Sequence, residues 1–285
     1  MTLLSLLQQS KAYLKPKSAT FSLDAELLLA HVLQQRREYV LTHSDAPISS
    51  EHQIHFEALV ERRAQGEPMA YLIGYQHFWK MCLKVTPDVL IPRPETEHLI
   101  EWILEKWDEK PLTVADLGTG SGAIAIALAL ERPHWTLLAL DQSDKALSVA
   151  KQNRDHYSLS NIHLLKSDWC TALPERCDVI VSNPPYIAPH DPHLADLSFE
   201  PLTALVSSNE GLADLETIIQ TAPLHLKPGG WLVLEHGYHQ AAAVRLLLGR
   251  AKYDKIMSYQ DLQQHERFTV GQFPHEKVSL QTNGR

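Results

Sequence analysis

The sequence predicts an α/β fold in which a doubly wound, mostly parallel sheet follows a small helical domain. Three observations support this prediction. Helix-forming patterns fill the first 75 residues, strand-like and helix-like segments alternate from residue 112 onward, and the last two strand-like segments have no helix between them. Such alternation indicates parallel strands covered on both faces, and the final pair indicates an antiparallel edge. We expect a helical domain at 1–75, a β-hairpin linker at 76–93 and a larger domain at 94–285.

The helical domain is predicted from two segments rich in helix formers. Residues 22–33 read SLDAELLLAHVL, and residues 49–63 read SSEHQIHFEALVERR. Ser50 and Gln53 have the spacing of a capping box, which would start the second helix. The apolar residues of that helix fall on one face: Phe56, Leu59 and Val60. A small helical unit of this kind is more typical of packing or recognition than of catalysis.

Residues 76–93 change character, because β-forming residues alternate loosely around Pro87. This pattern predicts a short hairpin that links the two domains. Pro94 is expected to open the next helix, since proline suits the first helical turn. The apolar stripe of that helix is predicted to be core: Leu99, Ile100, Ile103, Leu104 and Trp107.

The alternating region then runs almost to the end of the chain. The predicted strands are 112–118, 136–141, 162–168, 177–182 and 229–237, and the predicted helices are 121–132, 143–157, 212–226 and 239–251. The antiparallel pair is predicted at 255–262 and 266–273. No role is predicted for the tail after Phe273.

Composition narrows the class of protein. Of 285 residues, 44% are hydrophobic and 21% are charged, as in ordinary globular proteins. The 26 basic and 34 acidic residues give a net charge of −8, which argues against a broad surface for nucleic acid. The three cysteines form no CxxC pair and are expected to be reduced thiols. The N-terminus is a poor signal peptide and no apolar run is long enough for a membrane helix, so we expect a cytoplasmic protein without membrane contact.

A glycine-rich loop, VADLGTGSGAIA, joins the first strand of the sheet to its helix. Gly118, Gly120 and Gly122 let the backbone turn tightly and let a ligand come close. In an open parallel sheet the ligand lies beyond the carboxyl ends of the strands, where this loop falls. The spacing through Ala123 also fits a dinucleotide site, and a glycine bend without any ligand is a further alternative. Asp141 ends the second strand, where an acidic residue binds ribose hydroxyls.

Asp116 favours a cationic ligand over a dinucleotide. It comes just before the glycines, where a pyrophosphate would sit, and its carboxylate would repel that group. The same carboxylate would suit the amino group of S-adenosylmethionine, whose ribose matches Asp141. Asp168 and Trp169 follow the third strand and could line the adenine pocket, although Trp169 fits a core aromatic equally well.

The fourth strand ends in a rigid polar corner, Asn183-Pro184-Pro185-Tyr186. The two prolines remove two backbone donors and fix two φ angles. This strand should lie beside the first, so the corner should face the crevice of the glycine loop. The Asn183 side-chain oxygen and the Pro184 carbonyl could then accept both N–H groups of a planar amide or amine and align its nitrogen with a methyl donor. Tyr186 could pack on that acceptor group. A plain Pro-Pro turn is the alternative.

Three motifs, together with the DLGTGSG loop, resemble the PrmC/HemK family of class I S-adenosylmethionine-dependent methyltransferases: IPRPETE at 91–97, NPPYI at 183–187 and FEPLTAL at 199–205. The resemblance covers essentially the whole chain. It implies methyl transfer from S-adenosyl-L-methionine to the N5 amide nitrogen of the glutamine in the Gly-Gly-Gln motif of peptide chain release factors. The other product is S-adenosyl-L-homocysteine.

The resemblance also implies roles for individual residues. Asn183 and Pro184 would be catalytic, and with Pro185 and Tyr186 they would bind the substrate glutamine. Arg93 and Glu97 would shape the entrance, and the N-terminal helices would help to engage the release factor. The residues that would hold the cofactor are Asp116, Gly118, Thr119, Gly120, Ser121, Gly122, Asp141, Trp169 and Asn183.

The segment from Ile187 to about Glu210 is long for a loop, which favours a macromolecular substrate. It contains His190, Asp191 and His193, but no further convincing ligand lies nearby, so we expect no metal. Methylation of adenine or guanine amino groups in nucleic acid is the near alternative, and the acidic composition disfavours it. A nicotinamide-dependent oxidoreductase and a cofactor-binding protein without activity are weaker alternatives.

Overall fold

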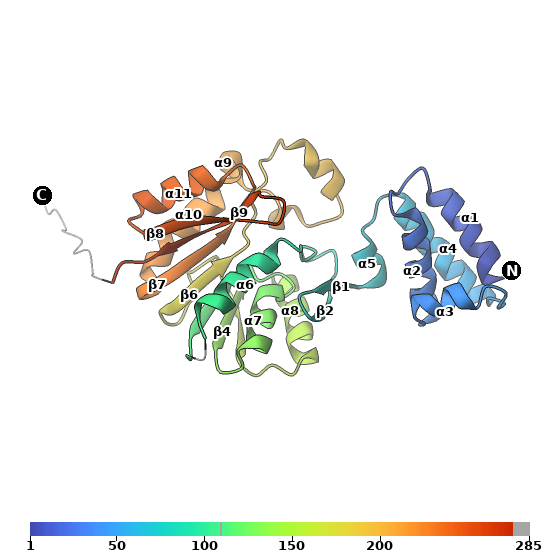
Figure 1. The fold of residues 1–285 in the computed structure, drawn as a ribbon, viewed down its shortest axis with the longest axis horizontal. Coiled ribbons are helices and arrows are strands. Elements are labelled where there is room, and N and C mark those ends of the chain that lie inside the picture. Colours follow the sequence, from blue (N-terminus) through green and yellow to red (C-terminus); the bar gives the residue numbers. More distant parts are fainter. Residues whose placement is uncertain (109, 276–285) are drawn as a thin grey trace, which may run out of the picture. The chain divides into compact units, whose positions relative to one another are not determined.

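The computed structural model describes residues 1–108 and 110–275, so most of the tail for which no role is predicted lies outside the described residues (Figure 1). The chain divides into two compact units, the first being Met1–Tyr75 and the second beginning at Gln76. Within the described residues, no helix is both long and apolar enough to cross a membrane.

The first unit is helical. Its core brings together leucines of the first two helices and Phe56 of the fourth, all fully buried or nearly so. A buried Asp24 accepts a hydrogen bond from Arg63 Nε at 2.8 Å, which ties the second helix to the fourth. The helices are α1 (Leu3–Leu14), α2 (Phe21–Leu33), α3 (Arg37–Thr42), α4 (Ser50–Ala64) and α5 (Met69–Ile73).

The start of α4 differs from the prediction. Ser49, rather than Ser50, caps the helix, because its side chain accepts the backbone N–H of His52 at 3.2 Å. Gln53 therefore lies one residue beyond the capping-box position, and its side-chain amide donates to Glu57 at 2.8 Å. Ser49 and Ser50 are adjacent, and either could cap the helix. The capping-box spacing alone therefore predicted the wrong serine.

A hairpin forms near the start of the predicted segment 76–93, and both of its strands precede Pro87. Strands β1 (Tyr75–Phe78) and β2 (Met81–Lys84) turn at Trp79 and Lys80, and Trp79 has a left-handed φ of 55°. Left-handed turn residues are normally glycine or asparagine, so Trp-Lys carried no turn signal. The hairpin is bonded to the larger unit, since the Asn153 side chain pairs with both the N–H and the carbonyl of Lys84.

The second unit contains the predicted doubly wound sheet. The strand order is β5-β4-β3-β6-β7-β9-β8, with parallel pairing from β5 to β7 and antiparallel pairing of β9 with both β7 and β8. The predicted antiparallel edge is thus confirmed, and β9, the last strand among the described residues, lies between β7 and β8. The strands are β3 (Thr113–Leu117), β4 (Thr136–Asp141), β5 (Ile162–Lys166), β6 (Cys177–Ser182), β7 (Leu226–Glu235), β8 (Asp254–Gln260) and β9 (Glu266–Gln272).

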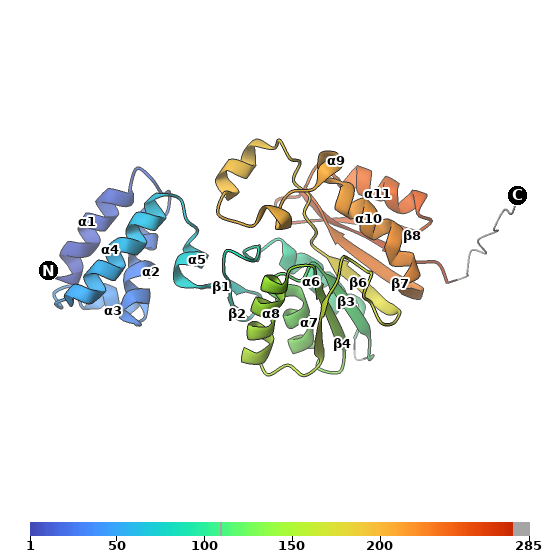
Figure 2. The same cartoon turned by 180° about the vertical axis from the view of Figure 1, so that it is seen from behind.

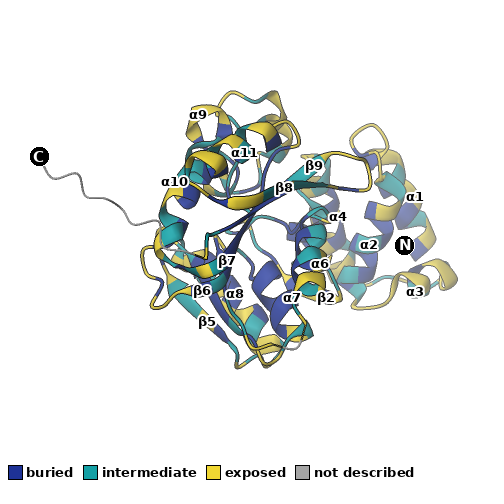
Figure 3. Cartoon of the chain, turned by 60° about the vertical axis from the view of Figure 1, so that its left-hand side comes forward, coloured by how far each residue is buried: buried dark blue, intermediate teal, exposed yellow. Residues whose placement is uncertain are grey.

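Helices cover both faces of this sheet. Helices α6 (Thr96–Lys106), α7 (Ala123–Glu131) and α8 (Asp144–His156) lie on one face, as Figure 2 shows from behind. Helices α10 (Ala213–Thr221) and α11 (Ala241–Arg250) lie on the other. Between the two layers the strands are apolar on both faces, and Figure 3 shows β7 in the dark blue of buried residues.

Helix α6 begins two residues after Pro94. Pro94 instead occupies a turn in which the Thr96 N–H bonds to the Arg93 carbonyl at 3.1 Å, a position that also suits proline. The predicted core residues Leu99, Ile100 and Ile103 are fully buried. The predicted helix 212–226 is likewise shorter, because α10 ends at Thr221 and a 3₁₀ turn, η3 (Ala222–Leu224), contains Pro223.

The long segment after β6 is folded back on itself. The Ile187 N–H bonds to the Leu205 carbonyl at 2.9 Å, and the Ser207 N–H bonds to the Ile187 carbonyl at 3.0 Å. These bonds close the base of the loop, so it is a compact excursion rather than an extended connection. Within it and just after it lie η1 (Pro192–Leu197), η2 (Leu202–Ala204) and α9 (Ser208–Gly211).

Candidate active site

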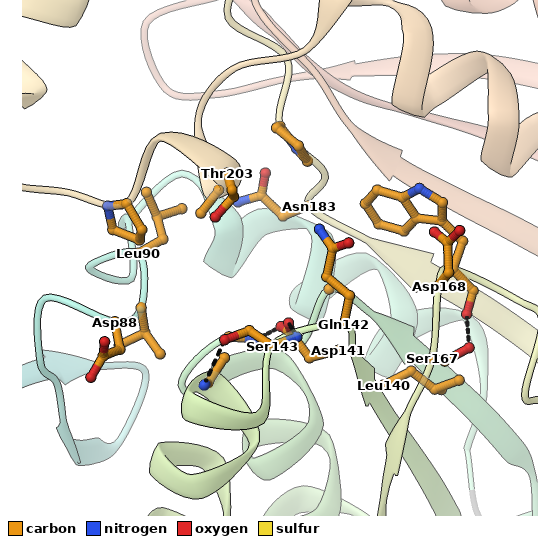
Figure 4. A pocket seen from close by; sticks show the side chains of 18 residues that line it. Asp88, Leu90, Leu140, Asp141, Gln142, Ser143, Ser167, Asp168, Asn183 and Thr203 are labelled. Carbon is orange, nitrogen blue, oxygen red and sulfur yellow. Dashed lines mark hydrogen bonds between the residues drawn. The ribbon is translucent and has the colours of Figure 1, made fainter.

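A cavity opens at the carboxyl ends of β3, β4 and β6. Figure 4 shows side chains from segments far apart in the sequence arranged around it. Its wall includes Gly118, Gly120, Asp141, Asn183 and Pro185. The glycine loop and the proline corner therefore face one cavity, as β3–β6 pairing requires. The other wall residues lie at 88–90, 140–146, 167–169 and 201–204.

The glycine loop needs its glycines for two different reasons. Gly118, Gly120 and Gly122 all have left-handed φ values of 71°, 57° and 85°. A Cβ on Gly122 would also lie 2.9 Å from Ile126 Cδ1, and one on Gly118 would lie 3.4 Å from the Trp169 ring. The left-handed φ values thus account for all three glycines, and only at Gly122 would a Cβ also come unusually close to a neighbour.

Asp141 is held firmly at the cavity wall. Its Oδ2 accepts the Gly120 N–H and its Oδ1 accepts the Ser143 N–H, both at 2.9 Å. Burial raises the pKa of this carboxyl, and the two backbone N–H groups oppose that rise. Each oxygen keeps a further lone pair, so the carboxylate can accept hydroxyl donors from a ligand in the cavity.

Asp116 lies on β3, buried behind the loop, and it does not line the cavity. Its Oδ2 accepts the Thr119 hydroxyl at 2.6 Å and the Ala125 N–H at 3.2 Å. Its Oδ1 has no hydrogen-bond partner among the described residues. Burial raises the pKa of Asp116 to about 7, which shows how little solvation this carboxyl receives. Three other predicted loop residues also lie off the wall: Thr119, Ser121 and Gly122.

Trp169 combines the two roles that its sequence left open. The ring lines the cavity and also packs against the buried cluster on the α10 side of the sheet. Its backbone φ of 46° is left-handed, which is unusual for a tryptophan. Such local strain is often found at functional sites.

The proline corner is divided between two cavities. Pro185 lines the first cavity, Tyr186 lines a second one, and Asn183 lines both. Among the described residues, no donor bonds to the Asn183 Oδ1 or to the Pro184 carbonyl. The second cavity is largely apolar, with Arg93 at its wall beside Leu90, Ile187, Leu197, Ala204 and Leu205.

Two links that sequence reasoning missed hold this corner and the loops around it. The buried Glu200 accepts the Ile91 N–H at 3.0 Å and forms an ion pair with Arg93. The Gln240 side chain donates to the Tyr186 carbonyl at 3.0 Å and to the Glu210 carbonyl at 3.2 Å. The FEPLTAL motif contains Glu200 and could have directed attention to it, whereas Gln240 carried no such signal.

A left-handed turn packs against the proline corner at the Tyr186 carbonyl. Asn209, Glu210 and Gly211 have φ values of 53°, 54° and 80°, so the chain makes three successive left-handed residues. A Cβ on Gly211 would lie 2.1 Å from the Tyr186 carbonyl oxygen, so only glycine fits there.

Two other predicted features lie away from the cavities. Glu97 accepts the Trp79 N–H at 2.6 Å, so it holds the hairpin turn. In the exposed part of the long loop, His193 Nδ1 lies 2.7 Å from the Asp191 carboxylate, and the two side chains bond each other.

Comparison with known proteins gives consistent matches. Residues 5–74 match the family described as PrmC N-terminal domain, and residues 95–197 match the family described as Methyltransferase small domain. The chain is 49% identical to a Release factor glutamine methyltransferase of Xylella fastidiosa, over 88% of this chain and 93% of that protein. It is 45% identical to the Release factor glutamine methyltransferase of Escherichia coli, over 88% and 91%.

A solved structure shares the fold at low sequence identity. It is the T. thermophilus 16S rRNA N2 G1207 methyltransferase in complex with AdoMet and guanosine, with a TM-score of 0.53 and 18% identity. The match covers 70% of this chain and 49% of that one. At this identity the likeness describes the architecture of the sheet and its helices only.

Proposed function

Because this chain belongs to the release factor glutamine methyltransferase family, we propose that its two cavities bind S-adenosylmethionine and a release-factor glutamine side by side. The enzyme transfers a methyl group to the side-chain amide nitrogen of that glutamine. The single observation that carries the proposal is the position of Asn183, which lies on the wall of both cavities. One side chain is thus in reach of both reactants.

The first cavity has the features that S-adenosylmethionine requires. The buried Asp116 has an unpartnered Oδ1, and although it does not line the cavity, its carboxylate behind the glycine loop suits a cationic amine. The fixed carboxylate of Asp141 suits two ribose hydroxyls, and the Trp169 ring suits the flat adenine. When bound, the cofactor supplies an electrophilic methyl group on a sulfonium ion.

The corner would act on the amide nitrogen of the substrate. An amide nitrogen is a weak nucleophile because its lone pair is delocalised into the carbonyl. The Asn183 Oδ1 and the Pro184 carbonyl accept its two N–H groups and hold the nitrogen in line for attack. The nitrogen would take the methyl group that the bound cofactor supplies, and it would then lose a proton to water.

The second cavity would hold the rest of the glutamine side chain. Its apolar wall suits the methylene groups, and Tyr186 can pack on the flat carboxamide. The rigid corner limits how the amide can turn, because the two prolines fix φ on either side of the acceptor carbonyl.

The remaining assignments complete the proposal. The helical unit 1–75 would recognise the release factor, with 76–93 as the connecting hairpin. No direct contact with nucleic acid or membrane is needed, and the cytoplasm is where a release factor is available. Methylation of adenine or guanine amino groups is not favoured, because the relatives that match most of the chain are named for release factor glutamine.

The test is direct methylation by the purified protein. It is incubated with S-adenosylmethionine and a purified release factor, and in parallel with DNA and RNA. Mass spectrometry of the digested release factor should show one added methyl group on the peptide with the Gly-Gly-Gln motif. Methylation of nucleic acid without methylation of the release factor would refute the assignment.

A further inference from the structure

The Asn183 amide can face the acceptor with either of its two ends, and only one end suits the reaction. Its oxygen accepts an N–H of the substrate amide, whereas its NH₂ group would oppose that N–H with another donor. The two ends have nearly the same shape, so packing alone does not choose between them. A neighbouring group that distinguishes a donor from an acceptor has to do so.

Thr96 is that neighbour. The Asn183 Nδ2 lies 3.3 Å from the Thr96 Oγ1, and Thr96 is the first residue of α6. Thr96 is only 4% exposed, so water competes little for its hydroxyl. A hydroxyl can either donate or accept, however. Thr96 therefore selects the NH₂ end of Asn183 only if its own proton points elsewhere.

Glu235 is placed to take that proton. Ser182 of β6 pairs with Leu234 of β7, so Asn183 and Glu235 are the next residues on neighbouring parallel strands. Thr96 and Tyr186 both lie close enough to the Glu235 carboxyl to oppose the rise that burial causes in its pKa. Glu235 is 3% exposed and its Oε2 has no partner among the described residues. The carboxyl is thus short of donors, and a hydroxyl beside it can supply one.

We propose that Thr96 and Glu235 are positioning residues that fix which end of the Asn183 amide faces the acceptor. Glu235 accepts the Thr96 hydroxyl proton, Thr96 accepts the Asn183 NH₂ group, and the Asn183 oxygen is left for the substrate. Tyr186 also lies beside this carboxyl, so a bond from its hydroxyl would orient the ring that packs on the acceptor. This inference rests on the proposed function, because it takes the acceptor to be an amide N–H.

The test compares Thr96→Val, Thr96→Ser and Glu235→Gln in the full-length enzyme. Thr96→Val removes the hydroxyl and keeps the branched shape, so kcat should fall by about tenfold while the Kd for S-adenosylmethionine stays within about twofold. Thr96→Ser keeps the hydroxyl and should restore most of kcat. In Glu235→Gln the new side-chain NH₂ group can donate to Thr96, so that the Thr96 hydroxyl donates to Asn183 instead of accepting from it. This variant should therefore also have a lower kcat. The matched controls are Thr217→Val and Glu105→Gln, both exposed, and these should behave as wild type.

A second readout follows the Asn183 amide itself. Its side-chain NH₂ signals can be found by NMR on asparagine-labelled protein as those that Asn183→Ala removes. In wild type these protons should exchange slowly with water, and in Thr96→Val they should exchange faster and shift. The amide of Thr96→Ser should resemble wild type.

Several results would overturn the inference. Wild-type kcat in Thr96→Val, or an unchanged Asn183 amide signal in that variant, would do so. If Thr96→Val does not fold, an unchanged kcat in Glu235→Gln would do so instead. A wild-type enzyme that binds S-adenosylmethionine but leaves the release factor unmethylated would count against the proposed function, and the NMR comparison would still decide the orientation of Asn183.

Discussion

The two sides of the proposed site, the cavity assigned to the cofactor and the corner assigned to the acceptor, are built in different ways. On the cofactor side, Asp141 is fixed by the N–H groups of Gly120 and Ser143, which belong to the loops after β3 and β4. On the acceptor side, the links join positions far apart in the chain, such as Asn183 to Thr96 and Tyr186 to Gln240. The cofactor side is held by bonds between loops that follow neighbouring strands, and the acceptor side is held by side chains from distant parts of the chain.

This difference has a functional meaning. Changes on the cofactor side should alter cofactor affinity and leave the aligned acceptor intact. Changes on the acceptor side should alter turnover, since alignment matters only once both reactants are bound. Each of the following substitutions tests whether the two sides separate in this way.

The largest effect is expected from Asn183→Ala. It removes an acceptor that faces both cavities, so kcat should fall by about 100- to 1000-fold. Cofactor affinity, measured by calorimetry, should stay close to wild type. A large loss of cofactor binding would mean that the two sides are not separable at this residue.

Glu200→Ala should affect both sides at once. Glu200 joins the segment at Ile91 and Arg93 to the loop at 201–204, and these flank both cavities. Losing a buried carboxylate with two partners should lower the free energy of unfolding by about 1.5–3 kcal/mol. Urea denaturation measures this loss, and calorimetry should show weaker cofactor binding. The exposed Glu105→Ala is the control, and equal stability of the two variants would show that the Glu200 link is not structural.

Asp141→Ala should act on the cofactor side alone. The lost carboxylate would weaken cofactor binding by about 1–3 kcal/mol, while kcat at saturating cofactor should change little. Asp141→Asn keeps one acceptor oxygen, so its cofactor affinity should lie between that of wild type and that of Asp141→Ala. If Asp141→Ala had normal cofactor affinity but a low kcat, Asp141 would act on turnover and not on cofactor binding.

The smallest effect is a pH dependence from Asp116. Burial raises its pKa from 3.8 to about 7, so near pH 6 the carboxyl is mostly neutral. A cationic amine favours the ionised form, so cofactor affinity should rise between about pH 6 and about pH 8 by less than tenfold. Calorimetry across this pH range measures the cofactor affinity, and in Asp116→Asn that affinity should depend much less on pH. An affinity that falls with rising pH would contradict the role of Asp116.

The same pKa shift also bears on stability. A carboxyl whose folded pKa exceeds its unfolded value stabilises the folded state at low pH. The contribution of Asp116 is therefore fully present below about pH 3.8 and is lost as the pH rises through about 7. In the free protein, Asp116→Asn should therefore reduce the loss of thermal stability over this range.

Most of the sheet could be predicted because each strand is recognisable from a short stretch of the sequence. Most strands of the parallel region are short apolar runs, and β4 and β6 were predicted with the bounds that they have. Two details were predicted wrongly or not at all, because the residues at those positions give no clear signal. The turn at Trp79 has no turn residue, and the cap at Ser49 has a second serine beside it.

The site was only half predictable for the same reason. The glycine loop and the proline corner are short motifs, so their residues could be named from the sequence. Glu235 and Thr96 come together only through the register of β6 with β7 and the start of α6, and no short motif encodes that. The buried position of Asp116, away from the cavity wall, likewise depends on where β3 ends.

The position of β9 has a consequence for how the protein is made. β9 is the last strand to be synthesised, yet it pairs with both β7 and β8. A growing chain on the ribosome therefore has to expose the outer edge of β7 until residues 266–272 emerge, and an unpaired edge invites aggregation. Since β7 ends in Glu235, chains that stop before Glu266 would leave the tunnel with the strand beside the proposed acceptor corner unpaired on its outer edge.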